Sequence, residues 1–304
     1  MRTARSAASR VALLTPLALL ALLACEQAVA QGGRAEIVQP PAWIEHESSP
    51  VALSAGTSLP TSTGVSTGAS GAVALLLGKT AQLGLGPDSR LYMDIEGAGA
   101  YDVPRATLRL ADGTVRVLYQ DTIATGPSWS IDAGSLRVEG GAGDVWVRRN
   151  QQHVAVCVMQ GSAQITHPRV GGFSLAQPLS CFESSGDAMP TPVLPIQRED
   201  AVRRVTTAAP QAGLGRMRAG AGWVIQLASV GDADRANRLI GELHAAGYAA
   251  TSEIERTEGK RIYRLRLDGF ESRPDANAIA TRLTGRFGIE RPWVSCPKSP
   301  PCQP

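Results

Sequence analysis

The chain has 304 residues, of which 43% are hydrophobic and 19% are charged, and its formal net charge is +3. This length and composition allow two modest hydrophobic cores. The near balance of charges, with no acidic or basic block, excludes a charged tail as the working part of the protein.

Residues 1–30 are predicted to be a signal peptide. Three arginines precede an apolar run over residues 11–24, which is too short and wrongly flanked for a stable membrane span. Two processing sites compete. Ala28-Val29-Ala30 is a small-x-small cleavage site, whereas residues 22–25 resemble a lipobox in which Cys25 would be lipidated. We therefore expect an exported, periplasmic protein that is anchored to the envelope membrane only if Cys25 carries a lipid.

The region that follows is predicted to contain strands and no long helix. Residues 31–49 include Gly32-Gly33 and Pro40-Pro41 and are predicted to be a tether. From residue 50 to residue 185 the chain consists of short apolar runs separated by glycine turns. Ala111-Asp112-Gly113 is typical of a hairpin turn. We expect an all-β domain of stacked or solenoid-like strands.

This β region resembles the FecR-like family of exported β domains over about residues 44–183. The motifs are Gly56-Thr57-Ser58-Leu59, Val65-Ser66-Thr67-Gly68, Leu110-Ala111-Asp112-Gly113 and Gly161-Ser162-Ala163-Gln164-Ile165. The signalling members also carry a cytoplasmic partner segment and a transmembrane helix, for which the sequence shows no counterpart. The resemblance therefore implies a β domain that contacts another envelope protein or serves as a spacer.

Four of the five cysteines follow the predicted signal peptide. An even number of cysteines in an oxidising compartment indicates two disulfides, although the sequence alone allows three pairings. Proximity favours Cys157 with Cys181 and Cys296 with Cys302, the latter within a Cys/Pro-rich tail over residues 296–304. Free buried thiols are the alternative. A metal site is not expected, because the cysteines do not cluster with histidines.

The C-terminal part contains an internal repeat. Residues 186–221, which begin with prolines and end rich in alanine and glycine, are predicted to be a flexible linker. Over residues 222–295 a β-α-β pattern occurs twice, so that Leu227 matches Leu267 and Leu243 matches Leu283. Each half changes from the period of a strand to that of a helix. We expect a ferredoxin-like βαββαβ domain with one open sheet face, and an α+β protein overall.

This repeat resembles the SPOR domain, a peptidoglycan-binding module. The motifs are Trp223-Val224-Ile225-Gln226-Leu227-Ala228-Ser229, Ala236 early in the first helix, and Tyr263-Arg264-Leu265-Arg266-Leu267-Asp268-Gly269-Phe270. The resemblance implies binding to glycan strands that lack their stem peptides, as cell-wall amidases leave at division sites. Asp268, and the absence of a proline between Gly269 and Phe270, depart from the family pattern. These departures affect the geometry of the loop that follows the third strand, and not the strand itself.

The residues of the expected site follow partly from the resemblance and partly from strand periodicity. Gln226 and Ser229 match positions of the family's opening strand, and Arg264 matches the arginine of its third strand. Amide and guanidinium donors beside an apolar surface suit a polyhydroxyl chain, and period two puts Ile262, Arg264 and Arg266 on one face. The predicted peptidoglycan-binding residues are Gln226, Ser229, Ile262, Arg264, Arg266 and Trp293.

Other interpretations of the same residues remain open. An exposed Arg-x-Arg on a strand is usually only a solvated face, and Trp293 could equally belong to the core. Sheets of this kind that carry arginines also occur in RNA-binding modules. However, residues 223–294 contain 11 basic and 10 acidic residues, and phosphate binding would need a clear basic excess. We expect no nucleic-acid partner.

The sequence does not favour an enzyme. Gly64-Val65-Ser66-Thr67-Gly68 fits a hydrolase nucleophile pattern, but no strand-to-helix turn follows it. The four histidines are scattered. Glu253, Glu255 and Glu258 could form a glycosidase pair, but we interpret them as a solvated edge, because nothing nearby indicates burial. No cofactor or metal is expected.

Together these patterns predict a cell-envelope protein that binds peptidoglycan through its C-terminal domain and is thereby recruited to division or wall-remodelling sites. The alternative is a periplasmic protein-interaction adaptor, or a FecR-like sensor or regulator, that works through the β domain.

Overall fold

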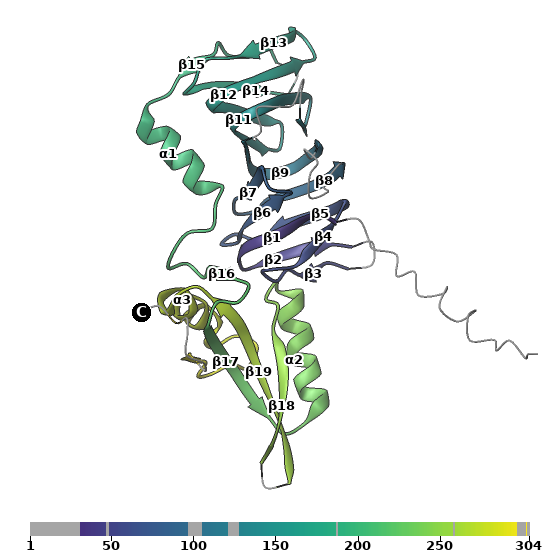
Figure 1. Cartoon of the computed structure of the whole chain (residues 1–304), viewed down its shortest axis with the longest axis vertical. Coiled ribbons are helices and arrows are strands. Elements are labelled where there is room, and N and C mark those ends of the chain that lie inside the picture. Colours follow the sequence, from purple (N-terminus) through teal and green to yellow (C-terminus); the bar gives the residue numbers. More distant parts are fainter. Residues whose placement is uncertain are drawn as a thin grey trace, which may run out of the picture.

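The computed structural model describes residues 31–46, 49–96, 105–120, 128–186, 188–257, 259–296 and 302. The predicted signal peptide, Cys25 included, lies outside this part of the chain. The described residues are mostly sheet, with three helices. No helix among them is long and apolar enough to cross a membrane. The strands of the β domain stack along the long axis of the molecule, and the C-terminal domain lies at one end (Figure 1).

The β domain consists of two sheets that share three long strands. The first sheet contains, in pairing order, β1 (Gln31–Gln39), β6 (Ala72–Leu77), β7 (Ala81–Leu85), β9 (Arg105–Tyr119), β11 (Leu136–Asn150), β12 (His153–His167), β14 (Ser180–Ser185) and β15 (Leu194–Pro195), with β4 (Ser58–Pro60) also on β1. The second contains β3 (Val51–Ala52), β2 (Ala42–Glu45), β5 (Ser62–Thr67), β8 (Arg90–Glu96), β9, β10 (Trp129–Ala133), β11, β12 and β13 (Gly171–Leu175).

Strands β9, β11 and β12, each 15 residues long, cross from one sheet into the other. Strand β9 pairs with β8 and β10 up to Asp112, and with β7 and β11 from Gly113 onward. The hairpin predicted at Ala111-Asp112-Gly113 is therefore wrong. Gly113 has a φ of +89°, a conformation that residues with a Cβ rarely adopt, so the glycine bends one strand between two sheets instead of reversing it.

The core of the β domain lies between the two sheets and follows the alternation of the strands. Its members include Leu75, Leu83, Leu108 and Val147, all fully buried.

The tether predicted over residues 31–49 is not seen, because residues 31–45 form β1 and β2 and bury Val38 and Ala42 in this core. Gly32 and Gly33 lie against the backbones of β4 and β6, where a Cβ would collide with carbonyl oxygens. Close backbone packing, and not chain flexibility, accounts for these two glycines.

Both disulfides predicted from proximity are present. Cys157 on β12 lies directly opposite Cys181 on β14, and the two Cα atoms are 4.1 Å apart. Cys296 is joined to Cys302, six residues further along the chain.

The segment predicted as a flexible linker, residues 186–221, makes contacts with both domains in the structure. Helix α1 (Arg198–Thr207) lies alongside the β domain (Figure 1). Ala208 is fully buried, and its carbonyl oxygen lies so close to Gly84 that a Cβ there would collide with it. The backbone N–H of Gln211 donates to Oε1 of Gln39 at 2.9 Å. The segment therefore follows the surface of the β domain.

The C-terminal domain contains a four-stranded sheet with two helices on one side. The elements are β17 (Trp223–Val230), α2 (Ala233–Ala245), β18 (Thr251–Thr257), β19 (Lys260–Phe270), α3 (Arg273–Leu283) and β20 (Trp293–Ser295). The strand order is β18–β19–β17–β20, and all neighbours are antiparallel. The helices cover one face and bury a core with Leu243, Ile279 and Leu283 against Ile225 and Leu267. The other face carries no helix.

Local sequence explains where the two helices begin. The carboxylate of Asp232 accepts hydrogen bonds from the amides of Asp234 and Arg235 at the start of α2, at 3.1 and 3.2 Å. Ser272 has the same role for α3, accepting from the amide of Asp275 at 3.2 Å, and Pro274 occupies the first turn, where no hydrogen bond is lost.

The two domains are in direct contact. Strand β16 (Met217–Arg218) pairs with both β1 and β19. Arg218 forms ion pairs with Glu36 of the β domain and Glu271 of the C-terminal domain. On the other side, the backbone N–H of Ala42 donates to the carbonyl oxygen of Gly247 at 3.1 Å. These contacts fix the direction in which the helix-free face points.

Candidate functional site

We define the open face as the residues of β17, β18, β19 and β20 that project away from the two helices. The register places them in cross-strand rows. Trp293, Gln226, Arg266 and Thr251 form one row across all four strands, and Ser229 lies opposite Arg264 in the next. Because directly paired residues point to the same side of a sheet, these side chains share one surface.

A bulge in β17 puts Gln226 and Ser229 on the same face. In a regular strand, residues three positions apart point to opposite faces. Here the pairing shifts between Gln226 and Ala228, so that Ser229 realigns with Arg264. The side-chain amide of Gln226 donates a hydrogen bond to Oγ of Ser229 at 3.0 Å. This hydrogen bond fixes the positions of the two polar groups relative to each other on the open face.

The arginines of the open face form ion pairs with carboxylates of the neighbouring strand β18 and, in one case, of β19 itself. Arg264 is paired with Glu255, and Arg266 with Glu253 at 2.7 Å and with Asp268 at 3.4 Å. Each arginine side chain keeps a substantial part of its surface in solvent, 44% for Arg264 and 33% for Arg266. The pairs hold the arginine side chains over the sheet and leave donors free for a ligand.

Trp293 supplies the apolar part of the open face. Its side chain is 68% exposed, in contrast to the half-buried Trp223 on the neighbouring strand. An exposed indole beside amide and guanidinium donors combines a flat apolar surface with hydrogen-bond donors, a combination that suits a sugar chain.

The structure brings the six predicted site residues together on this face. Ile262 lies on β19 two positions before Arg264, half-buried and opposite Glu255. The sequence interpretation missed the part played by Glu253 and Glu255, which it assigned to a solvated edge. Their spacing of two on the strand preceding the arginines was the available signal, because an antiparallel neighbour with the same period places the four charges on one face.

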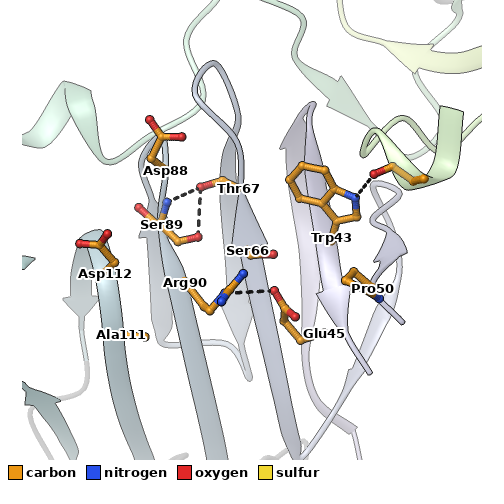
Figure 2. Close-up of a pocket in the computed structure, with 11 residues that line it drawn as sticks. Trp43, Glu45, Pro50, Ser66, Thr67, Asp88, Ser89, Arg90, Ala111 and Asp112 are labelled. Carbon is orange, nitrogen blue, oxygen red and sulfur yellow. Dashed lines mark hydrogen bonds and ion pairs between the residues drawn. The ribbon is translucent and has the colours of Figure 1, made fainter. Parts of the chain in front are cut away.

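A second feature is a hollow of about 610 Å³ on the outer surface of the β domain (Figure 2). It is lined by Trp43, Glu45, Pro50, Ser66, Thr67, Asp88, Ser89, Arg90, Ala111, Asp112 and, from the C-terminal domain, Ala245. Trp43 donates its indole N–H to the carbonyl oxygen of Ala245 at 3.2 Å, and Arg90 lies 3.3 Å from a carboxylate oxygen of Glu45. The polar groups drawn as bonded in Figure 2 are thus directed at one another.

The geometry of the open face agrees with what the family comparison finds. Residues 219–294 match the family model of the SPOR domain. These residues are a SPOR domain. The match confirms the resemblance and extends it four residues upstream of Trp223. SPOR domains are peptidoglycan-binding modules with no catalytic role, so the open face belongs to a binding domain.

Comparisons with whole proteins add little to this. No curated protein matches the chain. Two crystal structures, each of a "putative anti-sigma factor" from Parabacteroides distasonis ATCC 8503, resemble it at 12% and 11% sequence identity, with TM-scores of 0.38 and 0.35. The alignments cover 78% and 66% of this chain and 100% and 98% of those chains. The FecR-like resemblance of the β domain stays a prediction.

Proposed function

We propose that this protein is an exported, non-enzymatic envelope protein whose SPOR domain binds glycan strands of peptidoglycan that lack stem peptides. Binding of this kind would recruit the protein from the periplasm to division or wall-remodelling sites. The observation that carries the proposal is the row Trp293, Gln226 and Arg266, continued by Ser229 and Arg264, on a helix-free face of a SPOR domain.

The chemistry of this row supports a hydroxyl-rich ligand. Guanidinium and amide groups donate several hydrogen bonds in fixed directions, and sugar hydroxyls accept them. The extended row matches an extended chain, because donors that follow the sheet can contact successive sugars while the indole packs against a ring. A face that presents carboxylates beside its arginines lacks the basic excess that a phosphate backbone requires.

We expect residues 31–304 to co-sediment with peptidoglycan sacculi more strongly after amidase treatment than before it. Arg264→Ala should weaken this binding by about tenfold to a hundredfold, because it removes charge-assisted hydrogen bonds of about 1.5–3 kcal/mol in total. The measurement is the bound fraction as a function of sacculus concentration.

The matched control is Arg235→Ala, which removes an exposed arginine from α2 on the opposite side of the same domain. It should bind like the wild type. Equal losses in Arg264→Ala and Arg235→Ala would show that overall charge, and not the open face, governs binding. No binding of the folded wild-type chain to either kind of sacculus would exclude the glycan proposal.

A different observation favours the alternative, an adaptor that works through the β domain. Three large apolar side chains in the segment after β14 are strongly exposed: Met189, Leu194 and Val202. Exposed apolar side chains mark a contact with another protein when they lie in one patch, so the alternative requires that one partner cover these three together. If the adaptor function is the main one, Leu194→Ser should abolish localisation of the protein to division or wall-remodelling sites. Arg264→Ala should then leave this localisation unchanged.

A further inference from the structure

The hollow of the β domain contains a row of residues that resembles the row on the open face. Its members are paired on four successive strands: Trp43 on β2, Ser66 on β5, Arg90 on β8 and Asp112 on β9. The corresponding row of the open face is Trp293, Gln226, Arg266 and Thr251. In both rows an indole, a neutral hydrogen-bonding group and an arginine follow one another across antiparallel strands. This order suits a sugar, because it combines a flat apolar surface with fixed polar groups.

The indole and the guanidinium of the hollow are both held in place. Trp43 donates its indole N–H to the carbonyl oxygen of Ala245 at 3.2 Å. Arg90 lies 3.3 Å from a carboxylate oxygen of Glu45, and its side chain is still 56% exposed. Two strand spacings, about 10 Å, separate the backbones that carry Trp43 and Arg90. A short saccharide can span this distance.

Ser66 points to a ligand most directly. Its neighbour Val65 lies in the core, so the alternation of β5 turns Ser66 outward, where it lines the hollow between Trp43 and Arg90 (Figure 2). Ser66 is nevertheless only 7% exposed, and its hydroxyl has no hydrogen-bond partner among the residues that the structure describes. A buried hydroxyl without a partner costs free energy, and a ligand hydroxyl that reaches it would recover this cost.

Two exposed carboxylates, those of Asp88 and Asp112, complete the lining. Neither forms a side-chain hydrogen bond or an ion pair with a described residue. Carboxylates only accept hydrogen bonds, a guanidinium only donates them, and a hydroxyl does both, so the hollow matches sugar hydroxyls, which also do both. Among the lining residues, three carboxylates accompany a single guanidinium. This excess disfavours an anionic ligand.

We propose that the hollow is a second binding site, and that it takes a short, uncharged saccharide. The site is separate from the open face, because Ala245 is the last residue of α2 and the hollow therefore lies on the helix side of the SPOR domain. A glycan strand that an amidase has stripped carries carboxylates, so it is not the ligand of the hollow. The inference therefore does not depend on the proposed function.

The test is calorimetric titration of residues 31–304 with four trisaccharides. Chitotriose and maltotriose are uncharged, the trimer of glucosamine is cationic and the trimer of galacturonic acid is anionic. Binding of chitotriose alone would indicate N-acetylated sugars of the kind found in the wall, and binding of maltotriose alone a glucose polymer. We expect an uncharged trimer to bind more tightly than either charged one.

Ser66→Ala and Asp112→Asn should each weaken this binding by about threefold to tenfold, because each removes or weakens one hydrogen bond to the saccharide. The fold should tolerate Ser66→Ala, since alanine removes a hydroxyl that has no described partner. The matched controls are Ser62→Ala and Asp94→Asn, exposed residues that are paired with each other further along β5 and β8, outside the hollow. They should bind the trimer like the wild type, and so should Arg264→Ala.

Three results would overturn the inference. If neither uncharged trimer bound, the hollow would not be a site for such saccharides. Binding of the glucosamine trimer alone would show that the carboxylates select a cation. A loss in Arg264→Ala without a loss in Ser66→Ala would place the saccharide on the open face. The proposed function is tested separately with sacculi, so its failure would leave these titrations to decide the role of the hollow.

Discussion

Replacing Asp275 with alanine is expected to lower the free energy of unfolding by about 3–5 kcal/mol. The side chain is 2% exposed. Its Oδ1 accepts hydrogen bonds from the backbone amides of Gly213, Gly215 and Arg216 at 2.8, 3.0 and 2.9 Å, and its Oδ2 accepts one from the hydroxyl of Ser272. Alanine would leave these donors without their acceptor, and unmade hydrogen bonds of buried groups are costly.

Asp275 links the connecting segment to the SPOR domain, and this gives the experiment a local readout. Denaturant unfolding would measure the loss of stability, and hydrogen exchange would follow the amides of residues 213–216, which should lose protection. Asp275→Asn keeps one carbonyl oxygen as an acceptor but loses the charge, so we expect a smaller loss of about 1–2 kcal/mol.

Asp234→Ala is the matched control, because it removes an exposed acidic residue from the first turn of the other helix. It should cost no more than about 1 kcal/mol. If Asp275→Ala cost as little, or left the amides of residues 213–216 protected, these residues would not depend on Asp275 for their position in solution.

Asp275 also illustrates what could not be predicted from the sequence. The internal repeat indicated the strands and helices of the C-terminal domain, because periodicity of apolar residues reflects the core directly. The three backbone amides that Oδ1 of Asp275 accepts from lie 59 to 62 residues away in a stretch rich in glycine. Composition alone indicates flexibility there, since the hydrogen bonds that order such backbone come from a distant side chain.

The β domain shows the same difficulty for strands. Its apolar runs were identified, but the glycines between them, Gly113 and Gly161 included, were interpreted as turns. In both places the strand continues from one sheet into the other at a glycine of positive φ. A turn and a bend between sheets use the same residue type, and only the pairing partners distinguish them.

The open face was predicted more fully than its electrostatics. Strand period two was sufficient to put Arg264 and Arg266 on one side of β19. The joint orientation of Gln226 and Ser229 came from the family resemblance, because the bulge that produces it leaves no mark on periodicity. The pairing of the arginines with Glu253 and Glu255 depends on the register between β18 and β19, which is set by how the hairpin closes.

The second large effect is expected at Gly247, where the C-terminal domain meets the β domain. Gly247 follows α2 with a φ of +79°, and a Cβ at this position would lie 2.7 Å from both Cβ of Pro41 and Cζ2 of Trp43. Gly247→Ala should lower the free energy of unfolding by about 2–4 kcal/mol. About 1 kcal/mol arises from the left-handed backbone, and the remainder from the collision with the β domain.

Gly285→Ala separates these two contributions. Gly285 has a φ of +77° in the same domain, but nothing lies within 4 Å of its added Cβ, so the backbone contribution of about 1 kcal/mol should be the whole effect. In a Trp43→Ala background the extra cost of Gly247→Ala should shrink, because the ring that it meets is gone, while the cost of Gly285→Ala should not change.

Denaturant unfolding would give four changes in the free energy of unfolding, one for each alanine in each background. Spin labels on the two domains would report the distance between them. We expect Gly247→Ala to broaden the distribution of distances between the labels, and Gly285→Ala to leave it narrow. Equal effects of the two alanines on stability and on distance would mean that Trp43 and Gly247 are not in contact in solution. The open face would then turn freely relative to the β domain, and its direction would be set by the connecting segment alone.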